Sequence, residues 1–249
     1  MRPNIAFDKL GEGSPVILVL GAFNTREAGA PLAAALAAKH TVINYDRRGR
    51  GDSGDSAPYA VEREIEDLDL LVQGVGGAAA VFGFSSGAAL ALAAAAAGSA
   101  ITRLALFDLP LTVDPPSNPI DHAAALDVLV RAGRRGDAVE YFQREVVGIP
   151  EPVVAQLRHA PFRPALEAMA HTLIYECRIL GNGQLSLEQA RKVRAPTLAI
   201  AAGKGPPFMR ETAEAFARAV PDGQALVLEA ATHDLVPDVV APPLLRFYA

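Results

Sequence analysis

The stretch Gly83-Phe84-Ser85-Ser86-Gly87 decides the fold, because it joins a short apolar run to a run of small residues. Residues 78–82 (AAAVF) precede it, and residues 86–97 (SGAALALAAAAA) follow it as an expected helix. A strand that turns directly into a helix strains the residue at the turn, and small residues two positions away on either side allow the close approach. Gly83 and Gly87 meet this need, so the G-x-S-x-G pattern stands in the strand–turn–helix context that exposes a nucleophilic serine.

Ser85 is the candidate nucleophile of this turn. Its hydroxyl is expected above the edge of the sheet, at the N-terminus of the helix, where the helix dipole favours developing negative charge. The backbone N–H of Ser86 is free for the same reason and is expected to form one half of an oxyanion hole. Ser86 is the rival nucleophile, but the glycine spacing selects Ser85.

Short apolar runs and helical stretches alternate along most of the chain. This alternation predicts an α/β fold with a mostly parallel, doubly wound central sheet flanked by helices. Residues 4–10 are expected to add an edge strand. The predicted central strands are 16–20, 41–45, 78–82, 103–107, 197–201 and 225–229, and the predicted flanking helices are 31–39, 61–73, 86–97, 208–219 and 244–248.

One long interval breaks the alternation, because it has helical stretches but no convincing strand. We therefore expect a core of residues 1–111 and 195–249, and an all-helical insertion of residues 112–194 after the strand that ends at Phe107. An insertion at this point is expected to act as a lid over the carboxyl ends of the strands, where open α/β sheets bind ligands. A purely structural helical elaboration is the alternative. The predicted helices are 121–132, 137–147, 152–159, 164–180 and 187–193.

The composition excludes several classes of protein. The chain has 249 residues, is 51% hydrophobic and carries a formal charge of −5, which argues against an electrostatic nucleic-acid binder. A single cysteine, Cys177, forms no internal disulfide, and no His and Cys residues cluster at metal-ligand spacing. No stretch resembles a membrane span or the apolar core of a signal peptide. We expect a cytoplasmic protein that needs no metal or other cofactor and binds no membrane.

Several motifs together resemble the α/β-hydrolase fold family, in its branch with a serine nucleophile and a helical lid. Besides the turn at Ser85, residues 45–53 (YDRRGRGDS) are similar to the family's D-x-R-G-x-G-x-S segment. Residues 196–200 (PTLAI) resemble the strand that follows the lid, and residues 231–234 (ATHD) lie where the family places its catalytic histidine. The order and spacing of these motifs match over nearly the whole chain outside the lid.

The resemblance implies that His233 is the general base. It lies just beyond the last predicted strand, in the family's chain order of nucleophile first and histidine last. The other histidines, His40, His122, His159 and His171, are first interpreted as surface or core residues. The last three lie in the predicted lid and are open to a ligand role.

The acid that orients the histidine has two possible places in the family. The commoner place follows the strand at 197–201, but residues 202–207 (AGKGPP) hold no carboxylate, and the expected position is Gly205. Some relatives carry the acid after the preceding strand, where this chain has Asp108. Asp108 is therefore the predicted acid, which would orient His233 and stabilise its imidazolium. The alternative is an aspartate that caps a turn before proline.

The second half of the oxyanion hole is expected in residues 20–24 (LGAFN). The family usually has His-Gly where this chain has Leu20-Gly21, but a backbone donor tolerates the change of side chain. The donating N–H is expected from Ala22, with Phe23 as second choice. Phe23 and Phe84 are also expected to line an apolar substrate pocket, with core packing as the alternative.

The resemblance implies a serine hydrolase, specifically a serine esterase or lactonase. Its substrate would be a small, mostly apolar carboxylic ester, lactone or thioester, cleaved through an acyl-enzyme on Ser85. Two alternatives stay open. The same serine and histidine serve cofactor-free C–C hydrolases, acyltransferases and cyclases or lyases, and a non-catalytic protein on this fold would only bind its ligand. The sequence predicts neither the particular substrate nor the oligomeric state.

Overall fold

A seven-stranded sheet forms the centre of the molecule, in a computed structural model that describes residues 4–114, 117 and 120–249. The strand order is β1-β3-β2-β4-β5-β6-β7, and every neighbouring pair is parallel except the antiparallel edge pair β1–β3. The predicted α/β fold with a mostly parallel sheet is therefore confirmed. The strands are β1 (Phe7–Leu10), β2 (Pro15–Val19), β3 (Thr41–Tyr45), β4 (Ala79–Phe84), β5 (Ile101–Phe107), β6 (Thr197–Ala202) and β7 (Gly223–Leu228).

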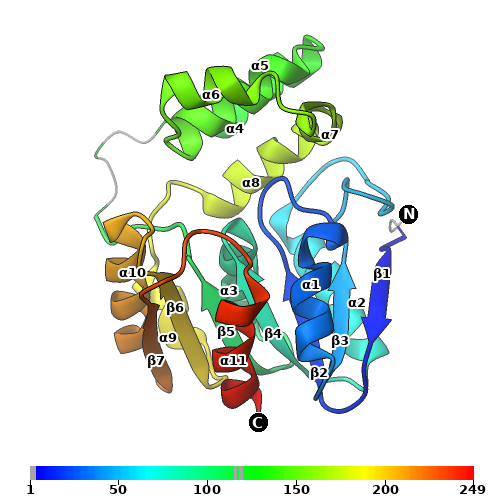
Figure 1. The fold of residues 1–249 in the computed structure, drawn as a ribbon, viewed down its shortest axis with the longest axis vertical. Coiled ribbons are helices and arrows are strands. Elements are labelled where there is room, and N and C mark those ends of the chain that lie inside the picture. Colours follow the sequence, from blue (N-terminus) through cyan, green and yellow to red (C-terminus); the bar gives the residue numbers. More distant parts are fainter. Residues whose placement is uncertain (1–3, 115–116, 118–119) are drawn as a thin grey trace.

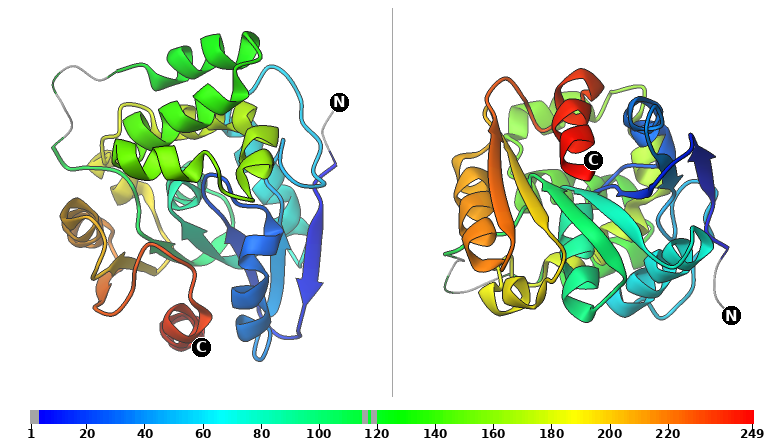
Figure 2. Two further views of the ribbon diagram at one scale, coloured as in Figure 1. Left: turned by 45° about the horizontal axis from the view of Figure 1, so that its top comes forward. Right: turned by 90° about the horizontal axis from the view of Figure 1, so that it is seen from below.

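Helices cover both faces of the sheet, which is why its central strands are apolar at consecutive positions. Figure 2 shows α1 (Arg26–Leu36) and α11 (Pro237–Tyr248) on one face, and α2 (Val61–Gly74), α3 (Ser86–Ala97) and α9 (Leu187–Lys192) on the other. Helix α10 (Pro207–Ala219) packs against β6 and β7. Two separate apolar cores result, one on each face.

The segment between β5 and β6 contributes most of the remaining helices. Figure 1 shows them stacked beyond one end of the sheet, with α8 nearest to it. They enclose a third apolar core of their own, centred on Leu126, Phe142 and Leu173. The elements are α4 (His122–Arg131), α5 (Arg135–Tyr141), the π-helical turn η1 (Phe142–Val146), α6 (Glu151–Leu157), α7 (Arg163–Ala168), the 3₁₀ turn η2 (Ala170–Thr172) and α8 (Leu173–Leu180).

Two helices begin earlier than the sequence predicts. Helix α1 begins at Arg26 rather than Pro31, because the carboxylate of Asp46 accepts the backbone N–H of Arg26 at 2.7 Å and so supplies the missing cap from another part of the chain. Helix α11 begins at Pro237 and runs through two further prolines, because Val240 and Ala241 are buried against the sheet. Tertiary contacts outweigh local propensity at both places.

No helix among the described residues is long and apolar enough to cross a membrane.

Candidate active site

Ser85 occupies a strained turn between β4 and α3, as the glycine spacing predicts. Its backbone has φ 56° and ψ −129°, a conformation that a residue with a side chain rarely adopts. Gly83 allows this turn because a Cβ at its position would lie 2.6 Å from the Cα of Ala88 in the first turn of α3. The turn places the Ser85 hydroxyl beyond the carboxyl end of β4.

The structure brings together Ser85, Asp108 and His233. In the sequence, His233 lies 125 residues from Asp108 and 148 residues from Ser85. His233 Nε2 lies 3.2 Å from the hydroxyl of Ser85, and His233 Nδ1 lies 2.8 Å from Oδ2 of Asp108. Both distances are within hydrogen-bond reach. One imidazole thus bridges a hydroxyl and a carboxylate, which is the arrangement of nucleophile, base and acid in serine hydrolases.

Asp108 is held in place from two sides. The residue directly follows β5, is fully buried, and has a positive φ of 51°. Its Oδ1 accepts the backbone N–H of Ala202 at the end of β6 at 2.8 Å, which leaves Oδ2 for His233. A buried carboxylate with two such partners is fixed in orientation. The last residue of β6 thus contributes a backbone donor to Asp108, and the turn after it, where Gly205 stands, carries no acid.

The loop after β2 lies directly against the serine. A Cβ added to Gly21 would lie 2.8 Å from the Cβ of Ser85, so this close approach requires glycine. The backbone N–H of Ala22, the predicted oxyanion donor, donates to the hydroxyl of Ser86 at 2.9 Å. The N–H of Ser86 itself belongs to the first turn of α3, where N–H groups have no intrahelical acceptor.

The two phenylalanines predicted for the pocket have different surroundings. The ring of Phe84 is buried and lies 5.6 Å from the ring of Phe107 and 4.8 Å from that of His233. Phe23 has a positive φ of 61° and packs edge-on against Phe142 of the π-helical turn, with ring centroids 5.5 Å apart. Phe23 therefore joins the loop after β2 to the helices beyond the end of the sheet.

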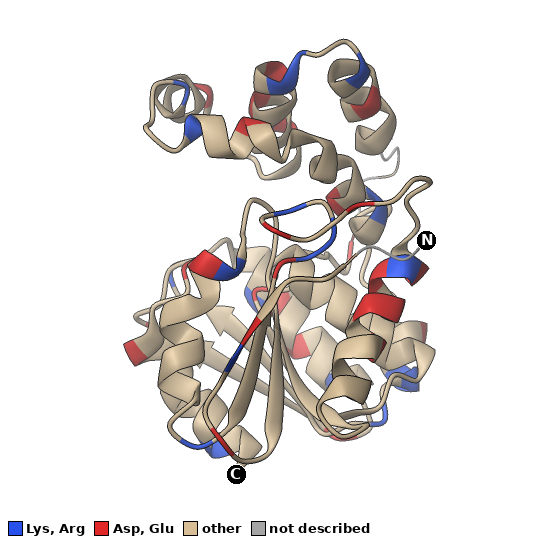
Figure 3. Cartoon of the chain, turned by 90° about the vertical axis from the view of Figure 1, so that its right-hand side faces the viewer, with Lys and Arg blue, Asp and Glu red and all other residues tan. Residues whose placement is uncertain are grey.

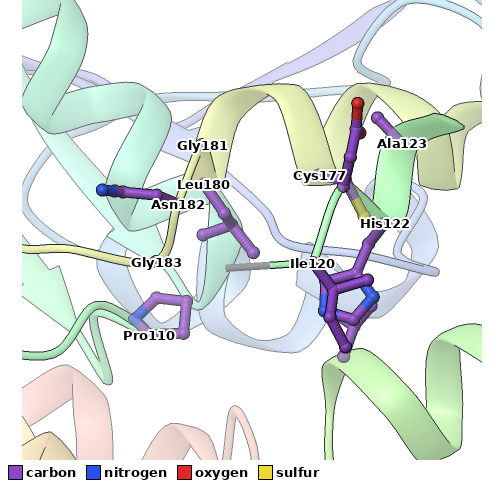
Figure 4. Close-up of a pocket in the computed structure, with 11 residues that line it drawn as sticks. Pro110, Ile120, His122, Ala123, Cys177, Leu180, Gly181, Asn182 and Gly183 are labelled. Carbon is purple, nitrogen blue, oxygen red and sulfur yellow. The ribbon is translucent and has the colours of Figure 1, made fainter. Parts of the chain in front are cut away.

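A small cavity of about 220 Å³ opens between the helical segment and the segment that follows Asp108. Figure 4 shows His122 and Ala123 of α4, Cys177 and Leu180 of α8, and Pro110 around it. Most of the lining is apolar, and neither Phe23 nor Phe84 belongs to it. The full lining is Pro110, Ile120, Asp121, His122, Ala123, Val146, Cys177, Leu180, Gly181, Asn182 and Gly183.

Beside the site lies a buried group of four charged side chains: Arg47, Arg50, Glu64 and Glu176. Each is at most 3% exposed. Arg47 makes a bidentate pair with Glu64 at 2.7 and 2.8 Å, and Glu176 of α8 accepts from both Arg47 and Arg50. Two cations face two carboxylates, so the group is balanced in charge. Figure 3 shows basic and acidic residues meeting where the sheet faces the upper helices.

We expect the fold to lose stability in acid because of the carboxylates in this buried group. Burial alone opposes ionisation of Glu64, but the charge and hydrogen bonds of Arg47 outweigh it and hold the pKa of Glu64 below its ordinary value of 4.5. When the pKa of a carboxylate is lower in the folded protein than in the unfolded chain, its charge stabilises the fold at every pH above the pKa of the unfolded chain. This stabilisation is lost as the pH falls from that value through the pKa of the folded protein. We expect a level Tm from pH 8 to about 5 and a steep fall below pH 4.5.

Thermal unfolding across this pH range checks the expectation, with Glu64→Gln as the matched control. The variant should be less stable than the wild type at pH 7, because Arg47 loses its charged partner, and should lose less Tm on acidification. Equal acid slopes for the two proteins would contradict the assignment.

The only thiol of the sequence is expected to be inert. Cys177 is buried on α8, and burial raises the pKa of its thiol to about 12. The reactive thiolate is therefore scarce at pH 8. Ellman's reagent should detect no thiol in the folded protein and one in denaturant, and iodoacetamide should leave the folded protein unmodified. Rapid modification of the folded protein would contradict this.

Comparisons with known proteins agree with the fold. A profile described as "Alpha/beta hydrolase family" matches residues 16–242, which is most of the chain. The chain belongs to the alpha/beta hydrolase family, as the sequence motifs indicate. No curated protein matches the chain significantly.

Several solved structures are similar to this chain. An alpha/beta hydrolase from Sphaerobacter thermophilus DSM 20745 is 50% identical, with a TM-score of 0.93 over 99% of this chain and 97% of the other. A thermophilic esterase from Thermogutta terrifontis is 24% identical, with a TM-score of 0.73 over 97% and 90%. The enol-lactonase from Burkholderia xenovorans LB400 is 21% identical, with a TM-score of 0.69 over 97% and 94%. The last two similarities show the shared fold.

Proposed function

We propose that this protein is a serine hydrolase that cleaves a small, mostly apolar carboxylic ester, lactone or thioester. The observation that carries the proposal is the continuous hydrogen-bonded line from Asp108 through His233 to Ser85. The family membership supports a hydrolase, and the esterase and lactonase among the structural neighbours support carboxylic esters as the substrate class.

The proposed reaction has two halves. His233 Nε2 takes the proton of Ser85 while Oγ attacks the substrate carbonyl, and Asp108 stabilises the resulting imidazolium through Nδ1. The tetrahedral intermediate places its oxyanion near the N–H groups of Ala22 and Ser86, where the substrate oxygen replaces the Ser86 hydroxyl as acceptor for Ala22. His233 then protonates the leaving group. Water activated by His233 hydrolyses the acyl-enzyme and releases the acid.

The helices α4 to α8, between β5 and β6, are proposed to act as a lid, whereas α9 of the same interval packs against α3 and α10. Residues 20–24, which carry the proposed oxyanion donor Ala22, are called the oxyanion loop. Phe142 of the π-helical turn packs on Phe23 of this loop, so the segment touches the site. The cavity of about 220 Å³ between these helices and Pro110 is lined by none of the three side chains Ser85, His233 and Asp108. The cytoplasmic location and the lack of a cofactor requirement stay predictions of the sequence.

The hydrogen bond between Asp108 and His233 favours an enzyme over a protein that only binds its ligand. The main argument for a binding protein is that no carboxylate follows β6. Asp108 removes this argument, because it reaches the histidine from the neighbouring strand β5. C–C hydrolysis, acyl transfer and cyclisation or elimination use the same side chains, so the products distinguish them. Ester hydrolysis gives an acid and an alcohol, and C–C hydrolysis gives an acid and a product with a new C–H bond. Acyl transfer gives a new acyl derivative, cyclisation an isomer of unchanged mass, and elimination an alkene and a leaving group.

Labelling with a fluorophosphonate probe and hydrolysis of p-nitrophenyl acetate or butyrate test the proposal. We expect one probe per chain, attached to Ser85 as identified by peptide mass spectrometry, and a burst of p-nitrophenol equal to the enzyme concentration. A folded wild-type protein that takes up no probe and hydrolyses neither ester would contradict the proposal.

A further inference from the structure

The buried arginines beside the site contact the oxyanion loop as well as their carboxylate partners. Arg50 Nη1 donates to the carbonyl oxygen of Gly21 at 2.6 Å, and Arg47 Nη1 donates to the carbonyl oxygen of Leu20 at 3.2 Å. Both acceptors are backbone carbonyl groups of the two residues that precede Ala22. The two guanidinium groups are buried, so water does not replace these bonds when they are lost.

The bond from Arg50 acts on one particular peptide group. The carbonyl of Gly21 and the N–H of Ala22 belong to the same planar trans unit, in which C=O and N–H point in opposite directions. A donor that holds the carbonyl therefore sets the direction of the N–H. A cation at the carbonyl oxygen also polarises the peptide and strengthens its N–H as a donor.

Glu176 holds Arg50 in the position that this bond requires. It lies on α8, is fully buried, and pairs with Arg50 while it also accepts from Arg47 at 3.2 Å. A helix between β5 and β6 thus supplies the anchor for the guanidinium that contacts Gly21. The orientation of the peptide depends on a contact between distant parts of the chain.

We propose that Arg50 and Glu176 are positioning residues that hold the Gly21–Ala22 peptide so that its N–H faces the oxyanion. This inference rests on the proposed serine-hydrolase function. Loss of one oxyanion-hole donor lowers kcat by about 10²–10³-fold in a serine protease. Substrate binding in the ground state does not use this donor fully, so KM should change little.

Arg50→Lys tests the proposal because it keeps the charge opposite Glu176 but cannot keep the same two bonds from one planar group. Arg48→Lys is the matched control. Arg48 is equally buried, and its described bonds end on Asp67, Ser56 and the carbonyl of Arg63, away from residues 20–24. Glu176→Gln, which keeps the side-chain volume, is the second variant and is used if Arg50→Lys fails to fold.

The measurements are kcat and KM for p-nitrophenyl butyrate per active site titrated by the burst, and inhibition by a phenylboronic acid that forms a tetrahedral adduct with serine. We expect Arg50→Lys to lose about 100-fold in kcat with KM within threefold of wild type, and to lose boronate affinity in proportion. Glu176→Gln should lose about tenfold in kcat. Arg48→Lys should lower Tm while kcat stays within twofold of wild type.

The outcomes separate the two proposals. If Arg50→Lys and Glu176→Gln keep kcat and boronate affinity within twofold of Arg48→Lys, the positioning role is wrong and the hydrolase proposal stands. If the folded wild type itself shows neither burst nor boronate inhibition, the hydrolase proposal fails first.

Discussion

Ser85→Ala is expected to lower the turnover of p-nitrophenyl butyrate by about 10⁶-fold, the scale on which removal of a serine nucleophile acts. The reason is the geometry of the turn: Ser85 alone presents its hydroxyl to His233 Nε2 at 3.2 Å, at the point where β4 enters α3. Without that hydroxyl no acyl-enzyme forms. The remaining rate should come from substrate binding and from the oxyanion donors.

Steady-state rates, burst amplitude and probe labelling measure the effect together. The burst and the fluorophosphonate adduct should both disappear. Thermal unfolding serves as the control: the melting temperature should stay within a few degrees of wild type, because Ser85 has few packing contacts to lose and alanine fits the same turn. A variant that keeps its burst would show that another residue, such as Ser86, forms the acyl-enzyme.

Asp108→Asn is expected to lower kcat by about 10⁴-fold, as the equivalent change does in a protease triad. The carboxylate accepts from His233 Nδ1 at 2.8 Å and from the N–H of Ala202 at 2.8 Å. An amide keeps the shape but presents an N–H₂ group to one of these donors, so His233 loses the tautomer that leaves Nε2 ready to take a proton. The negative charge that stabilises the imidazolium is also lost.

The pH dependence of kcat/KM and probe labelling distinguish this effect from unfolding. The variant should still take up fluorophosphonate, far more slowly, because Ser85 and the oxyanion loop remain. Asp234→Asn is the matched control. Asp234 is exposed, and its carboxylate accepts from Thr232 rather than from the imidazole, so its rate should equal that of wild type. A small effect at Asp108 and a large one at Asp234 would reverse the assignment of the acid.

The central fold followed from local pattern. Consecutive apolar residues mark strands covered on both faces, and each predicted central strand forms with its ends within two residues of the predicted ones. The turn at Ser85 was equally predictable, because a strand that enters a helix directly needs glycine on both sides of the exposed residue. Helix starts were less predictable at α1, where the cap is the carboxylate of Asp46, 20 residues away.

Some residues of the candidate site could likewise be predicted from the sequence, and others could not. The glycine spacing singles out Ser85, and the family resemblance adds His233 and Asp108. The carboxyl ends of β4 and β5, which carry Ser85 and Asp108, are neighbours in the parallel sheet. The contact of Arg50 with Gly21 and the pairing of Arg47 with Glu176 have no such signal. Arg47 and Glu176 are 129 residues apart, and α8 carries no motif that points to the loop after β3.

The sequence by itself determined which residues form strands and that Ser85 stands in a sharp turn, because steric rules and the period of apolar residues act over a few positions. The choice of His233 and Asp108 as candidates came from the resemblance of the motifs to a known family. Only the tertiary structure decided which side chain cancels a buried charge and which direction a peptide group faces. A buried guanidinium must find acceptors wherever packing provides them, and packing is a property of the whole chain.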